Sequence, residues 1–498
     1  MQILNSKEID MKNFIYIYII ASLVLFSCQD DFLESQPTEF ISSDRFQSIS
    51  DIDPTIQEAS LRGIYSSMYQ TGTGGTTGHD DFGQKGYDIF SDMLSSDMVL
   101  GAKIYGWYSG VSDLQVTVDF TSTRNYMIWR YYYRIILGAN AVIGTLGGND
   151  FVPEEDGVKA VMGQAKALRA YAYFYLANLM AEEYDPSVAI LPIYTEVTDV
   201  PSELKSTQEV YKLILDDLET AVEYLDGYAR PAKYAIDKYV AEGLLAYAYS
   251  VVGEHEKAAA AAKDAALNGG FSILTMDGVT EDGFNSVESP SWMWGVDITT
   301  DYGLDLVSWW GQVDLFTYSY AWAGDGKIIN DDLYDAIAND DARKAQFVNA
   351  YGDGQKYPIN KFYDPGRQIG GQRSITSDYV YMRVEEMYLL WAENAYKSGN
   401  EAAAREALKE LMENRVSDAS YIDVLSGQNL LDEIILQTRI ELWGEGKSYL
   451  SMKRNKLTIT LGSNHLTYPG VEIDYNDDRL TFEIPQSEIQ NNPLITGN

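Results

Sequence analysis

Apolar side chains recur at helical spacing in block after block of this 498-residue chain. Within residues 164–180 they follow i, i+3/i+4 and i+7/i+8 steps at Leu168, Tyr171, Ala172, Tyr175, Leu176 and Leu179. The same spacing occurs in residues 124–144, 207–225, 237–252, 383–399, 401–415 and 429–446. Such periodicity is typical of amphipathic α-helices. The sequence therefore predicts a mainly α fold.

Two stretches, residues 245–265 and 391–411, share a finer pattern. Each has a large–small residue pair, a glycine turn at Gly253 or Gly399, and a second, Ala-rich helix. Small residues let two helices approach closely, and the turn folds one helix back on the other, as in a tetratricopeptide hairpin. Degenerate copies are expected in residues 124–146 with 157–182 and in residues 207–226 with 234–252. Such hairpins bury their outer faces on neighbours, so we expect a stacked scaffold; unrelated amphipathic helices are the alternative.

Three segments lack this periodicity: residues 71–123, 270–380 and 455–485. They are rich in Gly, Asp and aromatic residues, and they include strand-like runs such as SWMWGVDIT (291–299) and RLTFEIP (479–485). Loops of this length are usually functional or disordered, and high aromatic content argues against disorder. We therefore expect long loop-rich insertions and a few short strands on the helical scaffold.

The N-terminal residues have the pattern of a targeting signal. An uncharged run over residues 14–27 follows Lys12 and ends at Cys28, the only cysteine. A positive flank and a short apolar core are typical of a secretory signal, and the run is shorter than the roughly 20 residues of a bilayer-spanning helix. We expect a signal peptide over residues 1–27, with the biological start at Met11 and cleavage before Cys28.

Cys28 is the predicted site of lipid attachment. The preceding LFS tripeptide resembles the bacterial lipobox, in which the cysteine thiol is acylated and the cysteine becomes the new N-terminus. A buried or incidental thiol is the alternative. Residues 28–45 would then form a polar, acidic tether. Residues 46–498 contain no Pro-rich or Gly/Ser-rich linker, so we expect them to form a single domain.

The net charge of −37 at pH 7 limits the partners of this chain. A polyanion of this size does not bind nucleic acid through its overall field, so we expect no nucleic-acid partner. It is also repelled by anionic lipid headgroups. Stable attachment to a membrane therefore needs an acyl anchor, and more than one acyl chain.

Residue patterns for catalysis and for cofactors are weak. The histidines His79, His255 and His465 are far apart in sequence and lack the spacing of a zinc site. The segment GTGGTTG (72–78) fits neither a dinucleotide fingerprint nor a phosphate-binding loop. DYNDDRLTFE (474–483) lacks the glycine that a calcium loop requires. We expect no cofactor and no metal. Carboxylates are plentiful, so a glycoside hydrolase pair remains a less favoured alternative.

Five motifs in order resemble the SusD/RagB-like family, the glycan-binding outer-membrane lipoproteins of Bacteroidetes nutrient-uptake systems. They are CQDDFLE (28–34), AKALRAYAYFYLANL (165–179) followed by LPIYTEV (191–197), RVEEMYLLWAENAY (383–396), RIELWGEGKSYLSMKR (439–454) and IPQSEIQNNP (484–493). Asn394, Lys447 and Ser451 depart from the family pattern, which puts the local polar network of the family in question. The motifs run through nearly the whole chain after Cys28.

This resemblance implies both a fold and a function. It implies four tetratricopeptide-type hairpins that support an irregular ligand-binding half, mainly residues 71–123 and 270–380. It also implies a non-enzymatic, lipid-anchored protein on the outer face of the outer membrane. Such a protein captures oligosaccharide or polysaccharide and docks as a lid on a SusC-like, TonB-dependent transporter. A protein–protein scaffold, or a peptide-binding lipoprotein that uses its repeats, is the alternative.

Aromatic residues of the irregular segments are the candidate glycan-binding residues. Trp129, Trp391 and Trp443 lie on helical blocks and are expected in the core. The candidates for sugar contact are Trp107, Trp309, Trp310 and Trp322, with Tyr105 as a helper. Sugar rings stack their apolar C–H faces on aromatic planes, while polar side chains satisfy the hydroxyls. We expect two or three of the five to touch ligand. In an extended chain Trp309 and Trp310 would point to opposite faces. Burial against the scaffold is the alternative for each.

Overall fold

The computed structural model describes residues 55–497, with side chains described from residue 57 onward. The predicted signal peptide, Cys28 and the tether therefore lie outside the described residues. From Gln57 onward the chain belongs to one unit, defined by the contacts that its residues make with one another.

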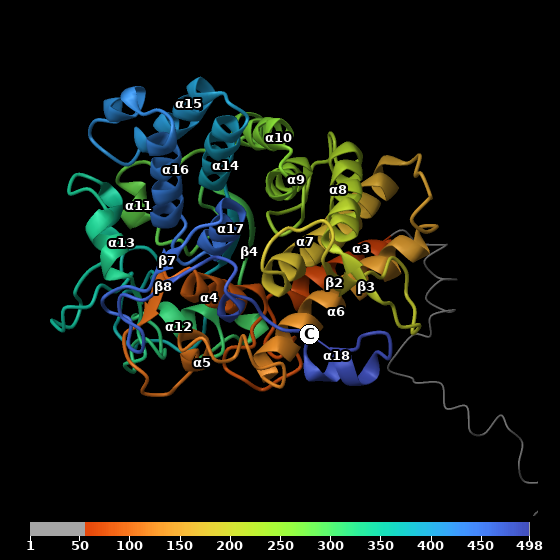
Figure 1. Ribbon diagram of the computed structural model, residues 1–498, viewed down its shortest axis with the longest axis horizontal. Coiled ribbons are helices and arrows are strands. Elements are labelled where there is room, and N and C mark those ends of the chain that lie inside the picture. Colours follow the sequence, from red (N-terminus) through yellow and green to blue (C-terminus); the bar gives the residue numbers. More distant parts are fainter. Residues whose placement is uncertain (1–54, 498) are drawn as a thin grey trace, which may run out of the picture. The chain divides into compact units, whose positions relative to one another are not determined.

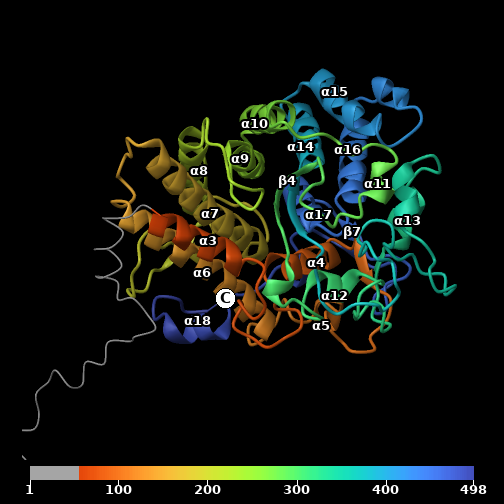
Figure 2. The ribbon, with the colours of Figure 1, turned by 180° about the vertical axis from the view of Figure 1, so that it is seen from behind.

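Helices dominate the described part of the chain (Figures 1 and 2). The α-helices are α3 (Thr55–Ser67), α4 (Gln84–Leu94), α5 (Ser109–Ser112), α6 (Thr123–Thr145), α7 (Asp156–Met180), α8 (Thr207–Tyr224), α9 (Lys238–Val252), α10 (His255–Asn268), α11 (Gly278–Glu281), α12 (Trp309–Val313), α13 (Asp331–Ala336), α14 (Val384–Lys397), α15 (Glu401–Met412), α16 (Gln428–Glu441), α17 (Lys447–Asn455) and α18 (Gln486–Asn491). The 3-10 helices are η2 (Thr300–Tyr302), η3 (Ala342–Gln346), η4 (Ser420–Val424) and η5 (Asp478–Leu480). The strands are β1 (Met98–Leu100), β2 (Ala189–Pro192), β3 (Leu204–Ser206), β4 (Trp292–Val296), β5 (Lys327–Ile329), β6 (Tyr379–Arg383), β7 (Ile459–Thr460) and β8 (Glu472–Ile473). This content confirms the predicted mainly α fold with a few short strands.

The long helices stack on one another in a continuous row. Helix α7 lies between α6 and α8, and α9 lies between α8 and α10. Helix α10 then contacts α14, although residues 270–380 separate the two in sequence, and α14 contacts α15 and α16. Both ribbon views show this row from α6 to α16 (Figures 1 and 2). The predicted tetratricopeptide-like hairpins are confirmed, because each helix buries its outer face on the next.

The turns between these helices follow local signals in the sequence. Ser206 and Glu209 form a capping box at the start of α8. The Ser206 hydroxyl accepts the Glu209 N–H at 3.2 Å, and the Glu209 carboxylate accepts the Ser206 N–H at 2.9 Å. Gly253 ends α9 with a φ of 83°, a left-handed conformation that glycine adopts without strain. The chain therefore reverses directly from α9 into α10, as the glycine turn predicts.

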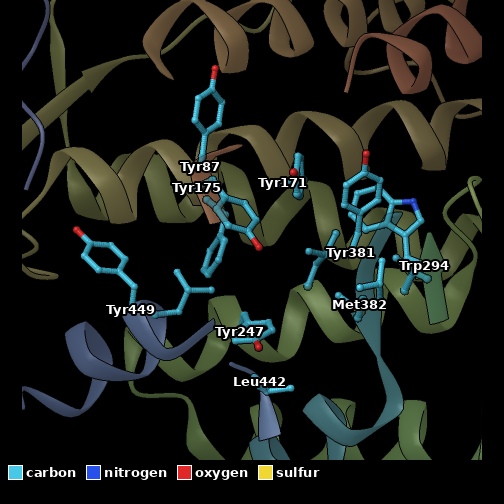
Figure 3. Packing of buried hydrophobic residues seen from close by; sticks show 14 of the residues in the cluster. Tyr87, Tyr171, Tyr175, Tyr247, Trp294, Tyr381, Met382, Leu442 and Tyr449 are labelled. Atoms are coloured by element: carbon cyan, nitrogen blue, oxygen red, sulfur yellow. The ribbon is translucent and has the colours of Figure 1, made fainter. Parts of the chain in front are cut away.

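A tyrosine-rich core lies between α7 and the β4–β6 sheet, as Figure 3 shows. The rings of Tyr171 and Tyr175 are 4.9 Å apart, and Tyr171 meets Trp294 edge-on at 5.3 Å. Trp294 in turn lies 5.1 Å from Tyr381. The tryptophans that the sequence predicts in the core are also buried, on other elements: Trp129 in α6, Trp391 in α14 and Trp443 between α16 and α17.

Short antiparallel strand pairs tie the loops together. Strand β1 pairs with β5 in the register Met98↔Ile329 and Leu100↔Lys327. Strand β4, within the predicted run 291–299, pairs with β6. The strands β2 with β3 and β7 with β8 form the other pairs of the described residues. The β1–β5 pair brings the two long irregular segments, 71–123 and 270–380, side by side.

Two sequence-based expectations for the irregular segments are wrong. Residues 84–94 form helix α4, in which every residue is buried, including Lys85 and Asp88, which pair at 2.8 Å. These buried polar residues give the helix a loop-like composition. The run RLTFEIP forms η5 and extended chain instead of a strand. Its backbone N–H groups bond to helices instead of to a neighbouring strand. The Phe482 N–H donates to the Leu179 carbonyl of α7 at 2.8 Å, and the Glu483 N–H donates to the Asn125 side chain of α6 at 3.0 Å.

A buried network of charges joins the family-like motif at residues 383–396 to the one at residues 439–454. Arg383 pairs with Glu445 at 2.9 Å and with Glu441 at 3.1 Å. Glu441 also pairs with Arg415 at 2.8 Å and with Arg343 at 3.0 Å. All five side chains are almost fully buried and have lost their contacts with water. The ion pairs within the network replace those contacts, so removing one member leaves a buried charge uncompensated.

The residues that depart from the family pattern keep polar partners. Lys447 lies 3.5 Å from Glu386 and donates to the Tyr175 hydroxyl at 3.0 Å. Asn394 donates to the Leu390 carbonyl at 2.9 Å. The Ser451 carbonyl and hydroxyl both accept from Asn455. Lys447 therefore links α17 to α7 and α14, whereas these hydrogen bonds of Asn394 and Ser451 stay within their own helices.

Candidate functional site

Asp325 joins the two loop-rich segments. Its carboxylate accepts the backbone N–H groups of Ile104, of Tyr105 at 2.8 Å and of Gly106 at 3.2 Å. Asp325 is 1% exposed, so water does not compete for these charge-assisted hydrogen bonds. This contact, called here the Asp325 clamp, holds residues 104–106 beside the loop that precedes β5. The clamp brings predicted site residues of both segments together.

Aromatic side chains gather around the Asp325 clamp. The Tyr105 ring meets the Tyr320 ring edge-on at 5.3 Å, and the Trp107 ring lies 6.3 Å from Tyr320. Trp322 packs against Tyr318 at 5.6 Å. Tyr105, Tyr318 and Trp322 are 56%, 37% and 39% exposed, whereas Tyr320 is buried and Trp107 is half-buried. These five residues are called here the aromatic platform. The structure thus brings two predicted site residues, Tyr105 and Trp107, together at Tyr320, and a third, Trp322, lies two residues further along the same loop beside Tyr318.

His79 supports the aromatic platform from the first segment. Its imidazole is parallel to the Trp107 indole, with ring centroids 4.9 Å apart and an interplanar angle of 1°. Its Nδ1 lies 2.6 Å from the Tyr320 hydroxyl oxygen. Its backbone carbonyl accepts a hydrogen bond from the Gln312 side chain at 2.8 Å. His79 therefore contacts both the half-buried Trp107 ring and the buried Tyr320 side chain, and it holds the two in place relative to each other.

Helix α12 and strand β5 form the base of the platform. The Lys327 ammonium donates to the Gln312 side chain at 2.8 Å and to the Asp325 carbonyl at 3.2 Å. Burial lowers the pKa of Lys327 to about 7, and the Asp325 carboxylate opposes that shift. The Tyr320 N–H donates to the Gly311 carbonyl at 2.8 Å. In both ribbon views α12 lies beside α4 and α5, the helices that flank residues 104–107 (Figures 1 and 2).

Trp309 and Trp310 do not belong to the platform, so the expectation that they contact sugar needs correction. Both lie in α12 rather than in extended chain, and they are 1% and 0% exposed. Trp309 packs edge-on against Phe362 at 5.1 Å, and the Lys85 ammonium lies 4.3 Å from the centre of its ring. A helical turn directs both large rings into the core, where burial of apolar area stabilises the fold. Neither ring is available to a ligand.

Sequence reasoning missed His79, Tyr318 and Tyr320. The two tyrosines carried only a partial signal: aromatic residues occupy every second position from Phe316 to Trp322. Side chains two residues apart share a face of extended chain. By this rule alone all four rings would lie on one face. Residues 316–324 form bends and turns instead of an extended chain, so Phe316 and Tyr320 are buried whereas Tyr318 and Trp322 are exposed. His79 had no such signal, since its partners come from distant parts of the chain.

Trp322 rests on Gly370. A Cβ added at position 370 would lie 2.4 Å from the Cε2 of Trp322. The φ of Gly370 is +61°, a conformation that other residues rarely adopt. Glycine at this position therefore lets the indole contact the backbone directly.

Charged side chains at the rim of the platform are already paired. The Arg373 guanidinium lies 4.6 Å from the centre of the Tyr318 ring and pairs with Asp305 at 2.9 Å. Asp80, next to His79, pairs with Arg124 at 2.8 Å. Burial raises the pKa of Asp80, and Arg124 opposes that shift. In each of these pairs the positive and negative charges compensate each other, while the side chains still offer hydrogen-bonding atoms at the rim of the platform.

The other histidines have structural partners. The His255 ring nitrogen lies 2.9 Å from the Asn394 side-chain oxygen, and the His465 ring accepts the N–H of Tyr468 at 3.0 Å. Among the described residues, no group of three or more His, Cys, Asp or Glu is arranged to hold a metal ion. In that same part of the chain, no helix combines the length and the apolar character needed to cross a bilayer.

Two family models match the chain. The model described as the SusD family matches residues 318–498, and the model described as "Starch-binding associating with outer membrane" matches residues 57–249. SusD-like protein P2 of Formosa agariphila is 25% identical over 98% of this chain and 99% of its own length. SusD-like protein P25 of the same organism is 29% identical over 42% of this chain, a match that spans 37% of that relative.

Solved structures share the fold. A SusD-like carbohydrate binding protein from Bacteroides vulgatus superposes with a TM-score of 0.74 at 24% identity, over 88% of this chain and 96% of that one. A SusD superfamily protein from Bacteroides thetaiotaomicron gives a TM-score of 0.72 at 22% identity, over 89% and 98% of the two chains. The two model matches, the full-length relative and the shared fold show that this chain belongs to the SusD/RagB-like family, a carbohydrate-binding family associated with the outer membrane.

Proposed function

We propose that this protein captures a glycan at the outer membrane on its aromatic platform. The observation that carries the proposal is the exposure of Tyr105, Tyr318 and Trp322 around the buried Tyr320, on two segments that the Asp325 clamp holds together. Large aromatic rings usually lose most of their exposed area on folding, so a group of exposed rings favours a binding surface. Sugar rings stack on such planes, and the paired polar side chains of the rim are suited to hydroxyl groups.

The proposal is for binding without chemical conversion. His79 is engaged with the Trp107 ring and the Tyr320 hydroxyl. The nearby carboxylates of Asp80 and Asp325 serve the ion pair and the clamp. A retaining glycosidase needs two free carboxyl groups about 5–5.5 Å apart on either side of the scissile bond. The titratable groups named at the platform have structural partners instead, which favours capture over hydrolysis.

Calorimetric titration with oligosaccharides tests the platform. The panel starts with starch fragments and continues with other neutral and acidic glycans. Trp322→Ala and Tyr105→Ala should each weaken binding by about 1–3 kcal/mol, the usual effect of removing a stacking residue at an interface. Tyr421→Ala is the matched control, because Tyr421 is also exposed, at 37%, but lies in η4 beside α15. Platform variants that bind as tightly as the unaltered protein, or a protein that binds no glycan of the panel, would refute the proposal.

The proposal extends to lipid anchoring at Cys28 and to delivery of the glycan to a TonB-dependent transporter. The apolar run that ends at Cys28 and the family membership support it. We expect the transporter to dock mainly on the helical repeats and to bury at least the roughly 1,200–2,000 Å² of a stable interface. Affinity purification from native membranes in mild detergent should recover an outer-membrane transporter. Recovery of a lone monomer would contradict this part of the proposal.

A further inference from the structure

A small cavity in the helical scaffold combines cationic side chains with polar groups. Its walls include Asn178 of α7, Tyr211 of α8, and Lys453, Arg454 and Lys456 at the end of α17. The cavity volume is about 80 Å³. One water molecule requires about 10–15 Å³ on this measure, so the cavity has room for an ion of several heavy atoms. It uses no residue of the aromatic platform.

Arg454 carries a buried donor that is not used. Its Nε and Nη2 donate to the Glu393 carboxylate at 2.7 Å each, so that edge of the guanidinium is fully engaged. Its Nη1 is buried and has no hydrogen-bond partner among the described residues. The side chain is 3% exposed. A buried donor without an acceptor is costly, and an acceptor in the adjoining cavity would remove that cost.

Lys453 adds a buried positive charge without a carboxylate partner among the described residues. Its ammonium donates to the carbonyls of Ala181 and Glu182, at 3.0 and 3.1 Å, and to the Thr481 hydroxyl at 2.6 Å. Burial lowers the pKa of Lys453 to about 7, although the carboxylates of Glu182 and Glu183 oppose that shift. An anion nearby would supply the missing compensation.

The remaining walls supply one more cation and one more donor. Lys456 lies at the exposed side and pairs with Glu183, with side chains 58% and 32% exposed. The Tyr211 hydroxyl accepts from the Asn178 side chain at 3.2 Å, which leaves its own proton for another acceptor. Burial raises the pKa of Tyr211, so that proton stays in place at neutral pH. Three basic side chains thus line the cavity, in a chain with a net charge of −37; Arg454 and Lys456 pair with Glu393 and Glu183, and Lys453 has no carboxylate within ion-pair distance among the described residues.

We propose that this cavity binds a tetrahedral oxyanion of the phosphate or sulfate type. The Nη1 of Arg454 and the hydroxyl of Tyr211 donate to its oxygens, and Lys453 and Lys456 compensate its charge. Guanidinium groups and lysines are the usual protein partners of such anions. The volume admits the group itself, which can be a free inorganic ion or the terminal group of a sugar phosphate.

Thermal unfolding and calorimetry with sodium sulfate and sodium phosphate test this site. Both salts should raise the melting temperature in a saturable way, because a ligand that binds only the folded state stabilises it. Sodium chloride at the same ionic strength should not. Tyr211→Phe removes the donor without changing the volume and should weaken sulfate binding about tenfold. Lys456→Ala, at an exposed position, should weaken it without endangering the fold.

The controls repeat the same chemical changes on α8 but outside the cavity walls. Tyr224→Phe and Lys212→Ala should leave sulfate affinity unchanged. Crystals grown with selenate should show anomalous density in the cavity. Competition by glucose 6-phosphate would identify a carried phosphate group as a ligand, and its failure would identify the free ion. Equal stabilisation by chloride, or unchanged sulfate affinity in both Tyr211→Phe and Lys456→Ala, would overturn the assignment.

Discussion

The Asp325 clamp allows a test of the platform that leaves every aromatic residue in place. Asp325→Asn keeps the size of the side chain and one oxygen acceptor, but it removes the charge and one of the two carboxylate oxygens. Those two oxygens accept three backbone N–H groups, from Ile104, Tyr105 and Gly106. We expect residues 104–106 to leave their fixed position in the variant, so that Tyr105 no longer lies against Tyr320.

The expected loss of glycan affinity is about 2 kcal/mol, or roughly thirtyfold in Kd. Each hydrogen bond to a charged group contributes about 1.5–3 kcal/mol, so three such bonds set an upper limit of several kcal/mol. The net effect is smaller, because Ile104 and Tyr105 are 63% and 56% exposed and their freed N–H groups can bind water. Affinity falls because only the fraction of molecules with an ordered loop is competent to bind.

Asp378→Asn is the matched control. The Asp378 carboxylate is buried and accepts the N–H groups of Val287 and Ile298, each at 2.7 Å, in a loop that carries no platform residue. Calorimetry should show reduced affinity only for Asp325→Asn, and hydrogen exchange should show faster exchange at residues 104–106 in that variant alone. If those amides exchange faster while affinity stays within twofold of the unaltered protein, the clamp does not position the binding surface.

Three further changes test other parts of the structure. Gly370→Ala should displace Trp322, because the added Cβ meets the indole at 2.4 Å; glycan affinity should fall with only a modest change in melting temperature, and unchanged affinity would contradict the contact. Glu445→Gln should lower the free energy of unfolding near pH 7 by about 3–5 kcal/mol, since it breaks the buried pair with Arg383. Burial alone would raise the pKa of Glu445, but Arg383 and Lys361 hold it at about 2. The stability that this group provides is therefore complete above its unfolded pKa of about 4.3 and is lost as the pH falls towards 2. Stability curves of variant and unaltered protein that run parallel across this window would refute the assignment. Cys28→Ala should abolish lipid attachment and membrane association, whereas an unmodified Cys28 in the native protein, found by intact mass spectrometry, would contradict the predicted anchor.

The sequence by itself determined the helical scaffold. Helical periodicity and turn chemistry are local properties, so the spacing in residues 164–180 and the turn glycines Gly253 and Gly399 were sufficient to predict the hairpins. The core positions of Trp129 in α6 and Trp391 in α14 followed from the helical pattern, because a helix fixes which of its faces is covered. Trp443 is also buried, but it lies in the turn between α16 and α17. Helix α4 escaped detection because its polar residues find partners only in the folded protein.

The candidate site was decided by tertiary structure. Trp309 and Trp322 lie in one aromatic-rich stretch of sequence, yet the first is 1% exposed and the second 39%. Nothing local separates them, since exposure depends on whether distant residues such as Phe362 or Gly370 pack against each ring. His79 gained its role in the same way, through contacts with rings that come from both loop-rich segments. Secondary structure follows from neighbours in sequence, whereas a binding surface made of loops follows from neighbours in space.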